Sequence, residues 1–237
     1  MVLLSFRAPV KAGAASQPLP AARTVADILE SLIVAGVLVF LIVRPFFVQA
    51  FYIPSESMEP TLMGHDAGVD PATNEDYQHT IHDHLFVDKL AYRFHPPRRG
   101  DIIVFLAPKR ADIEDQNNGL PEKQNVLIKR LIGIPGDTIL VKDGAVYRNG
   151  KRLNEPYIKE PMKLDSHVPF GSPGSPGDPA IGVPPGAVHL APGELWVMGD
   201  NRNNSSDSRY WGPLRETRVI GRADCIFWPL DRIRILH

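Results

Sequence analysis

One long apolar run constrains this chain of 237 residues more than any other feature of its sequence. Every residue from Leu32 to Val43 is apolar or glycine, and the wider window 28–48 is interrupted only near its ends. A helix over that window just reaches the roughly 30 Å of bilayer hydrocarbon, at about 1.5 Å per residue. Pro45 can end the helix, and the aromatic residues after it suit a membrane interface. We therefore expect residues 28–48 to form one transmembrane anchor.

The basic residues near the run predict its orientation. They are unequally divided, with three before the run and one close behind it: Arg7, Lys11, Arg23 and then Arg44. Because cytoplasmic segments carry an excess of such residues, we expect residues 1–27 in the cytoplasm and residues 49–237 as one domain outside. Two alternatives remain, a buried core helix or a secretory signal that is cleaved after Val48-Gln49-Ala50.

Composition narrows the class of protein. A hydrophobic content of 43% and a charged content of 22% are typical of a globular domain. The formal net charge of -1, without a long block of one sign, argues against nucleic acid as a partner. Cys225 is the only cysteine, so it forms no internal disulfide, and its apolar neighbours favour a strand position over chemistry.

Beyond Tyr52 the sequence predicts a mainly β fold with antiparallel strands. Short runs rich in β-branched and aromatic residues alternate with turn residues, and no long amphipathic helix or internal repeat is evident. Asp143-Gly144 predicts a tight hairpin and Pro135-Gly136 a turn. The expected strands are Asp101–Leu106, Val126–Ile132, Thr138–Lys142, Ala145–Arg148, Glu194–Met198 and Arg218–Trp228.

Two segments, residues 65–82 and 168–192, are expected to be long surface loops. The first contains His65, His79 and His82 among several aspartates. No metal-binding motif has this spacing, so we expect solvated histidines, no metal and no other cofactor.

Ser57 is a candidate nucleophile, and a serine hydroxyl needs a base. No G-x-S-x-G motif is present, and no histidine lies in a recognisable catalytic motif. Lys129 lies in an apolar run, where burial would favour the neutral amine. Lowering its pKa from about 10.4 by about 2 to 3 requires roughly 3 to 4 kcal/mol. When each residue is considered alone, the ordinary alternative is that Lys129 points to solvent from a strand and that Ser57 only caps a turn.

Three segments closely resemble the motif boxes of bacterial type I signal peptidases, in the family's order. They are Ser55–Leu62, Lys129–Asp137 and Gly199–Gly212. The resemblance runs to about Pro229 and implies an antiparallel β-sheet signal-peptidase fold with one N-terminal transmembrane helix. It also implies a membrane-bound serine endopeptidase, a signal peptidase I, that removes N-terminal signal peptides from exported preproteins after small-residue (A-x-A type) sites.

The resemblance further implies roles for single residues. Ser57 would be the nucleophile and neutral Lys129 the general base, and the Ser57 N–H and the Ser55 hydroxyl would form the oxyanion hole. In the supporting network, Ser205 would hydrogen-bond the lysine, alongside Asp207, Arg209, Asp200 and Arg130. The candidates for the substrate pocket are Phe51, Ile53, Met58, Leu127 and Ile128. Glu56 and Asn203 depart from the residues common at their positions, but neither removes a group with a catalytic role.

Two rival functions are considered. One is a LexA-like self-cleaving serine-lysine peptidase, which the anchor and the Gly199–Gly212 box argue against. The other is an inactive membrane-tethered scaffold that binds export precursors, which the intact Ser57 and Lys129 argue against. The expected partners are secretory preproteins, the lipid bilayer and, as a further candidate, the protein translocation machinery. The expected location is the bacterial inner (cytoplasmic) membrane, crossed once, with the catalytic domain on the extracytoplasmic side.

Overall fold

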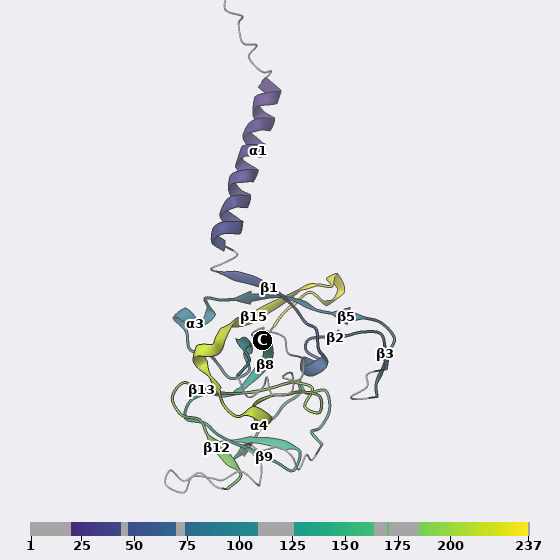
Figure 1. The fold of residues 1–237 in the computed structure, drawn as a ribbon, viewed down its shortest axis with the longest axis vertical. Helices are drawn as coiled ribbons and strands as arrows, with labels where there is room; N and C mark the ends of the chain where they lie inside the picture. The colour runs from purple at the N-terminus through teal and green to yellow at the C-terminus, as the bar shows by residue number, and fades with distance from the viewer. Residues whose placement is uncertain are drawn as a thin grey trace, which may run out of the picture. The chain divides into compact units, whose positions relative to one another are not determined.

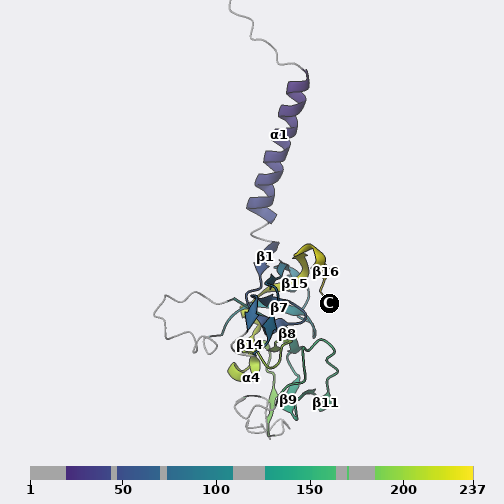
Figure 2. The ribbon, with the colours of Figure 1, turned by 90° about the vertical axis from the view of Figure 1, so that its right-hand side faces the viewer.

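The computed structural model describes residues 20–43, 47–69, 74–108, 126–163, 170 and 185–236. The chain divides into two compact units, Met1–Arg44 and Pro45–His237. Figures 1 and 2 show the helix of the first unit and the sheets of the second.

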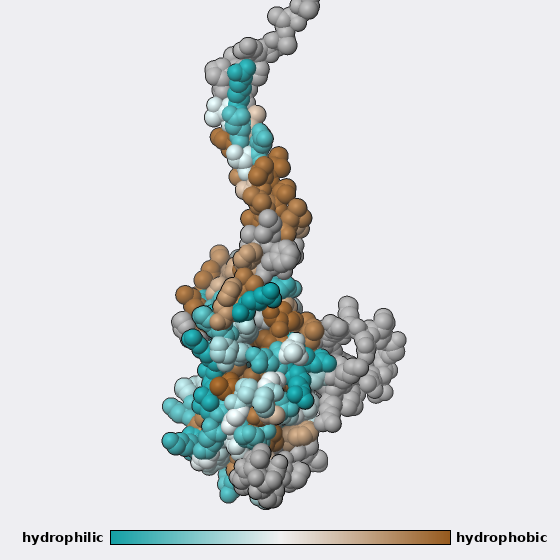
Figure 3. Space-filling model, turned by 90° about the vertical axis from the view of Figure 1, so that its left-hand side faces the viewer, coloured by the Kyte–Doolittle hydropathy of each residue, from teal (hydrophilic) through white to brown (hydrophobic). Residues whose placement is uncertain are grey.

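In the first unit, helix α1 runs from Pro20 to Leu38 and continues as the π-helix η1 from Val39 to Val43. The stretch Arg23–Leu41 has a mean hydropathy of 2.1 and none of it is buried, so this helix is long and apolar enough to cross a membrane. Figure 3 shows that its first turns are more polar than its later ones. The helix begins eight residues before the predicted anchor range 28–48, and its described part ends at Val43. The polar lead is helical too, because helical hydrogen bonds do not require apolar side chains, and Val48 already belongs to strand β1.

The second unit is built around one large antiparallel sheet, as predicted. Its strand order is β1-β6-β15-β7-β8-β13-β14, and β16 pairs with β15. The strands are β1 (Val48–Tyr52), β6 (His84–Asp88), β15 (Val219–Trp228), β7 (Ile102–Leu106), β8 (Val126–Gly133), β13 (Glu194–Met198), β14 (Leu214–Arg215) and β16 (Arg234–Ile235). The predictions for β7, β8, β13 and β15 are confirmed to within about one residue at the ends.

A smaller sheet of order β11-β10-β9-β12 lies at the opposite end of this unit from β1 and β15 (Figures 1 and 2). Its strands are β9 (Thr138–Lys142), β10 (Ala145–Arg148), β11 (Lys151–Arg152) and β12 (Ala187–His189). The predicted hairpin is confirmed: Asp143 and Gly144 take φ of 52° and 70° between β9 and β10, as a type I′ turn requires. Because β12 pairs with β9, the end of the expected loop 168–192 is a strand, and most of that loop lies outside the described residues.

The expected loop 65–82 contains two short strand pairs within its described part. They are β2 (Gly64–His65) with β5 (Ile81–His82), and β3 (Gly68–Val69) with β4 (Asp76–Tyr77). The described helices of this unit are single turns: α3 (Ala91–Phe94), α4 (Ser208–Trp211), η2 (Glu56–Met58), η6 (Glu216–Arg218) and η7 (Leu230–Arg232).

Strand β8 joins the buried clusters on either side of the large sheet. Ile128 packs against the cluster that contains Ile53 and Met58, whereas Leu127 packs against another cluster that contains Phe105. Neighbouring side chains on a strand point to opposite faces, so β8 is held from both sides. A residue placed on β8 therefore has little freedom to move.

Candidate active site

Ser57 lies in the single 3₁₀ turn η2, directly after the extended segment that follows β1. Two contacts hold the turn in place. The Ser57 carbonyl accepts a hydrogen bond from the Asn201 N–H at 3.2 Å, and the next side chain, Met58, is fully buried. Ser57 itself is 9% exposed. Its hydroxyl is thus held at a fixed place with limited access to water.

Lys129 comes to this hydroxyl from β8. Its neighbours in the sheet are set by pairing with β7, where Lys129 lies opposite Ile103, and with β13, where Arg130 lies opposite Met198. The lysine is 3% exposed, and its Nζ lies 2.7 Å from the Ser57 Oγ. Two residues far apart in the sequence are therefore in direct hydrogen-bond contact.

The surroundings of Lys129 favour its neutral form. Burial lowers the pKa of Lys129 to about 8, although the nearby Asp207 and Asp200 carboxylates pull the pKa upward. A lysine with such a pKa is uncharged in roughly a tenth of molecules at pH 7 and in half of them near pH 8. The amine can therefore accept a proton from the hydroxyl that it contacts.

Ser55 lies beside the nucleophile candidate. The Ser55 and Ser57 hydroxyl oxygens are 3.4 Å apart, and Ser55 is exposed. An exposed hydroxyl at this distance can rotate toward an oxygen atom bound next to Ser57. Such a donor is suited to an oxyanion, which is the expectation for Ser55.

Asp207 and Arg209 form a buried ion pair whose charges act on Lys129. The Arg209 Nε and Nη2 donate to the two carboxylate oxygens of Asp207 at 2.8 Å and 2.9 Å. Burial alone would raise the pKa of Asp207, but the Arg209 charge and the backbone N–H groups of Gly199 and Arg209 hold that pKa below its ordinary value. The pair is thus charged at neutral pH.

One predicted contact in this network is wrong. The Ser205 hydroxyl donates to the Asp207 carboxylate at 2.9 Å rather than bonding to Lys129, whose Nζ bonds to Ser57 among the described residues. An ionised carboxylate is the stronger acceptor, and Asp207 is two residues away. Ser205 is therefore linked to the lysine only through the charge of Asp207.

Asp200 and Arg130 form a second buried pair. The Arg130 Nε and Nη2 donate to the Asp200 oxygens at 2.8 Å and 2.6 Å, and Thr61 donates to the same carboxylate at 2.5 Å. The Arg130 guanidinium also lies over the Tyr157 ring, 4.1 Å from its centre. This pair joins β8, the segment after η2 and the Gly199–Gly212 segment.

The five candidates for the substrate pocket are not all brought together. Ile53 and Met58 are buried in one cluster, and Phe51 and Ile128 pack against the same cluster while partly exposed. Leu127 is on the opposite face of β8 and packs against a different cluster. The alternation of side chains along a strand separates it from the other four.

Sequence reasoning missed several residues around Ser57. His65 was expected to be solvated, but it is 5% exposed and its Nδ1 lies 2.5 Å from a carboxylate oxygen of Glu59. His82 is also partly buried and contacts the Ile53 carbonyl through its Nδ1 at 2.8 Å, whereas His79 is exposed.

The site also requires a glycine at position 199, because a Cβ on Gly199 would overlap Ser205 and the Ser57 carbonyl. Only the pairing of distant segments reveals these contacts.

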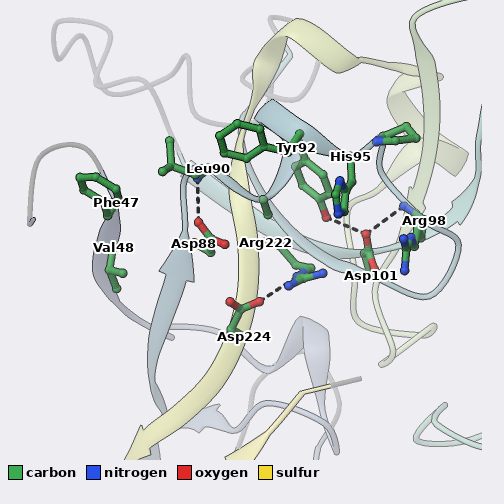
Figure 4. Close-up of a pocket in the computed structure, with 13 residues that line it drawn as sticks. Phe47, Val48, Asp88, Leu90, Tyr92, His95, Arg98, Asp101, Arg222 and Asp224 are labelled. Atoms are coloured by element: carbon green, nitrogen blue, oxygen red, sulfur yellow. Dashed lines mark hydrogen bonds and ion pairs between the residues drawn. The ribbon is translucent and has the colours of Figure 1, made fainter.

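Among the described residues, no group of three or more His, Cys, Asp or Glu side chains is arranged to hold a metal ion. A separate cleft of about 640 Å³ lies beside α3 (Figure 4). Ser57 and Lys129 do not line it. Figure 4 shows that its polar groups bond to one another: Arg222 pairs with Asp224 at 2.7 Å, and Tyr92 donates to Asp101 at 2.9 Å.

The chain is similar to known proteins over most of its length. A family model described as signal peptidase, peptidase S26, matches residues 25–228. Signal peptidase I of Leptolyngbya laminosa is 38% identical over 93% of this chain and 87% of its own length. The probable signal peptidase I-1 of Synechocystis is 37% identical over 85% of this chain and 82% of its own length. Signal peptidase I of Mycobacterium tuberculosis is 34% identical over 94% of this chain and 79% of its own length.

The matched region contains all three segments that resemble the family's motif boxes, so the resemblance found in the sequence is confirmed. The chain belongs to the signal peptidase family, peptidase S26, whose members are serine peptidases.

Proposed function

We propose that this protein is a membrane-anchored endopeptidase that removes N-terminal signal peptides from exported preproteins by means of Ser57 and a neutral Lys129. The observation that carries the proposal is the 2.7 Å contact between Lys129 Nζ and Ser57 Oγ, made by a lysine whose pKa burial lowers to about 8. An amine in this state is suited to activating a serine hydroxyl.

The reaction proceeds through an acyl-enzyme. Neutral Lys129 accepts the hydroxyl proton as Ser57 Oγ attacks the scissile carbonyl, and the resulting ammonium gives that proton to the departing amine. Lys129 then takes a proton from a water molecule that attacks the ester. The oxyanion of each tetrahedral intermediate accepts hydrogen bonds from the Ser57 N–H and the Ser55 hydroxyl, and losing one such donor typically costs about a hundredfold or more in rate.

The two buried ion pairs support Lys129 without contacting the substrate. Asp207 with Arg209, and Asp200 with Arg130, place balanced charge around the amine. Carboxylates without paired arginines would favour the ammonium form of Lys129. Arginines without paired carboxylates would oppose the protonation of Lys129 during the reaction. Paired charges keep the pKa within the range in which the amine both accepts and returns a proton.

Selectivity for small side chains at A-x-A type sites is assigned to the apolar surface beside Ser57. Phe51 and Ile128 are partly exposed there and pack against the buried cluster that contains Ile53 and Met58, and Leu127 is the weakest of the five candidates because it packs on the other face. Exchanging Ile128 for Ala enlarges the space and is expected to relax selectivity, which sequencing of the cleaved ends measures. Unchanged selectivity would remove Ile128 from the pocket.

The membrane part of the proposal is supported by α1 and by an apolar surface on the second unit. This surface, here named the aromatic patch, extends over β1, β6, β15, η7 and β16 and consists of Tyr52, Phe86, Phe227, Trp228, Leu230, Ile233 and Ile235. Trp228 is 49% exposed and Ile235 69%, and the Phe86 and Phe227 rings stack at 4.2 Å. Exposed apolar side chains gathered in this way suit the interface of a bilayer.

We assign the protein to the bacterial inner membrane, with the second unit on the extracytoplasmic side and preproteins as substrates. The translocation machinery is a further candidate partner. In this location the cleavage site of a precursor lies just outside the bilayer, on the side to which we assign Ser57.

The test incubates purified full-length protein with a preprotein that carries a signal peptide, beside the Ser57→Ala and Lys129→Ala variants. Wild type is expected to release the mature protein, and each variant to lose at least about a thousandfold in rate. Processing by either variant at the wild-type rate would refute the pair. An inactive scaffold would bind the preprotein without cutting it, and a self-cleaving peptidase would cut its own chain instead.

A further inference from the structure

The inference concerns Glu59, which follows Ser57 by two residues and ends the same turn. The Glu59 N–H donates to the Glu56 carbonyl at 2.9 Å, so its backbone closes η2. Its side chain is 1% exposed. A buried carboxylate is costly unless charged or polar groups satisfy it, so its partners determine where the turn lies.

Those partners come from two other parts of the chain. One Glu59 oxygen lies 2.5 Å from His65 Nδ1, and the other accepts from Lys159 Nζ at 3.0 Å and lies 3.2 Å from the Tyr77 hydroxyl, which bonds more closely to Glu75. His65 stacks on Tyr77 with ring centres 3.8 Å apart. Glu59 is therefore fixed by the segment 64–82 and by the segment that contains Lys159.

Lys159 also reaches the Gly199–Gly212 segment. Its backbone N–H donates to the Asp200 carbonyl at 3.1 Å, and the Asp200 side chain pairs with Arg130, the neighbour of Lys129 on β8. The contacts of Glu59 thus link the turn that carries Ser57 to the same elements that hold Lys129. Reaction between the two requires their tips to stay within hydrogen-bond distance, and a displacement of about 1 Å can cost a hundredfold in rate.

We propose that Glu59 is a positioning residue that acts through Ser57: its buried carboxylate, held by His65, Tyr77 and Lys159, keeps the nucleophile in reach of Lys129. Glu59 does not touch the reacting atoms. The inference rests on the proposed function, because it assigns a second residue to the placement of the same hydroxyl.

The test compares Glu59→Gln with wild type on the same signal-peptide substrate. The amide keeps the shape of the side chain but loses the charge that faces His65 and Lys159, the latter also paired with Glu75 at 2.5 Å, so kcat is expected to fall about 10- to 100-fold while KM stays within about twofold. The pH midpoint of the activity is expected to stay in place, because the charges that act on Lys129 are Asp207, Asp200 and Arg209. Glu194→Gln is the matched control, since Glu194 is a partly buried carboxylate that pairs with the exposed Arg215 at 3.6 Å, and it is expected to keep wild-type kinetics.

Each outcome decides something. An unchanged kcat in Glu59→Gln would overturn the inference, as would a rise of the pH midpoint, which would mean that the variant had let water reach Lys129. If Glu59→Gln lacks the thermal transition of wild type, Lys159→Met takes its place. The Lys159 side chain is 21% exposed, and its replacement removes a partner of the Glu59 carboxylate. Lys159→Met is expected to lower kcat at constant KM, and an unchanged kcat contradicts the inference. A wild-type protein that does not cut the substrate would refute the proposed function itself.

Discussion

Burial and nearby carboxylates act on the pKa of Lys129 in opposite directions. Burial is the larger influence and lowers the pKa to about 8, while Asp207 and Asp200 raise it. A fully desolvated lysine without these carboxylates would be a weaker base, and a solvated one would be almost wholly charged at neutral pH. The two carboxylates therefore keep the pKa of the amine above the value that burial alone would give it.

Gly199 offers a test of how closely Ser57 is positioned. A Cβ at this position would overlap the Ser57 carbonyl and the Ser205 side chain, and the carbonyl belongs to the backbone, so it cannot rotate away. We expect Gly199→Ala to displace the nucleophile and to lower kcat about a hundredfold. The control is Gly36→Ala in α1, where a Cβ meets nothing within 4 Å. Steady-state kinetics that leave Gly199→Ala as active as Gly36→Ala would contradict the account.

At the level of single residues, the motif boxes in the sequence predict Ser57 and Lys129 as the reacting pair, and the structure brings Lys129 Nζ within 2.7 Å of Ser57 Oγ. The sequence did not reveal the burial of His65 or the role that we propose for Glu59. A histidine in a polar segment is usually solvated, and only the return of the segment 64–82 onto η2 brings this ring to the Glu59 carboxylate. The hydrogen bond of Ser205 was also assigned to the wrong partner, because the competing acceptor Asp207 is chosen by local geometry.

Among the structural elements, the turn that leads into α4 contributes most to the charge around the site. Asp207 caps α4 by accepting from the Arg209 N–H at 3.2 Å, and it also pairs with the Arg209 side chain. Because the pKa of Asp207 is lower in the folded protein than in the unfolded chain, its ionised form stabilises the fold at neutral pH. That stabilisation is lost as the pH falls through the folded pKa.

We expect Asp207→Asn to lower the free energy of unfolding by about 3 to 5 kcal/mol, because it leaves the Arg209 charge buried and unpaired. The loss is expected at pH 7 and is expected to shrink in acid, where wild type loses the same charge. Since Asp207 raises the pKa of Lys129, the variant is also expected to work from a lower pH than wild type. Equal unfolding curves at pH 7 would contradict the importance of the pair.

The elements that the sequence predicted well are those with strong local signals. The β9–β10 hairpin follows from Asp143-Gly144, and β7 and β8 follow from dense apolar runs. The first strand was missed because Val48–Tyr52 continues the apolar character of the anchor window. Strand β12 is three residues long and lies within a Pro/Gly-rich stretch, so nothing local distinguishes it, and it forms only because β9 offers a free edge.

For the whole molecule, the membrane contact that we propose depends on the apolar helix α1 and on the aromatic patch of the second unit. Replacing Trp228, Ile233 and Ile235 by Ser removes much of the exposed apolar area of the patch. We expect this triple variant to process a preprotein inserted in lipid vesicles about tenfold more slowly, because less apolar area is buried at the interface. Cleavage of a short peptide in detergent is expected to stay at the wild-type rate.

The control for the patch is Phe94→Ser, which removes an equally apolar side chain that is 75% exposed on α3, outside the patch. It is expected to behave as wild type in vesicles and in detergent. A triple variant that is slowed equally in both media would have lost catalysis rather than membrane contact, and the patch would then have another role.

The most direct test of the central claim is the dependence of kcat/KM on pH for the wild-type protein with a signal-peptide substrate. Below its pKa Lys129 is an ammonium and cannot take the Ser57 proton, whereas above it the amine is neutral. The account predicts that activity rises about tenfold per pH unit in the acid range and levels off through a midpoint near 8. Activity that continues to rise beyond pH 10, the range of a solvated lysine, would contradict it.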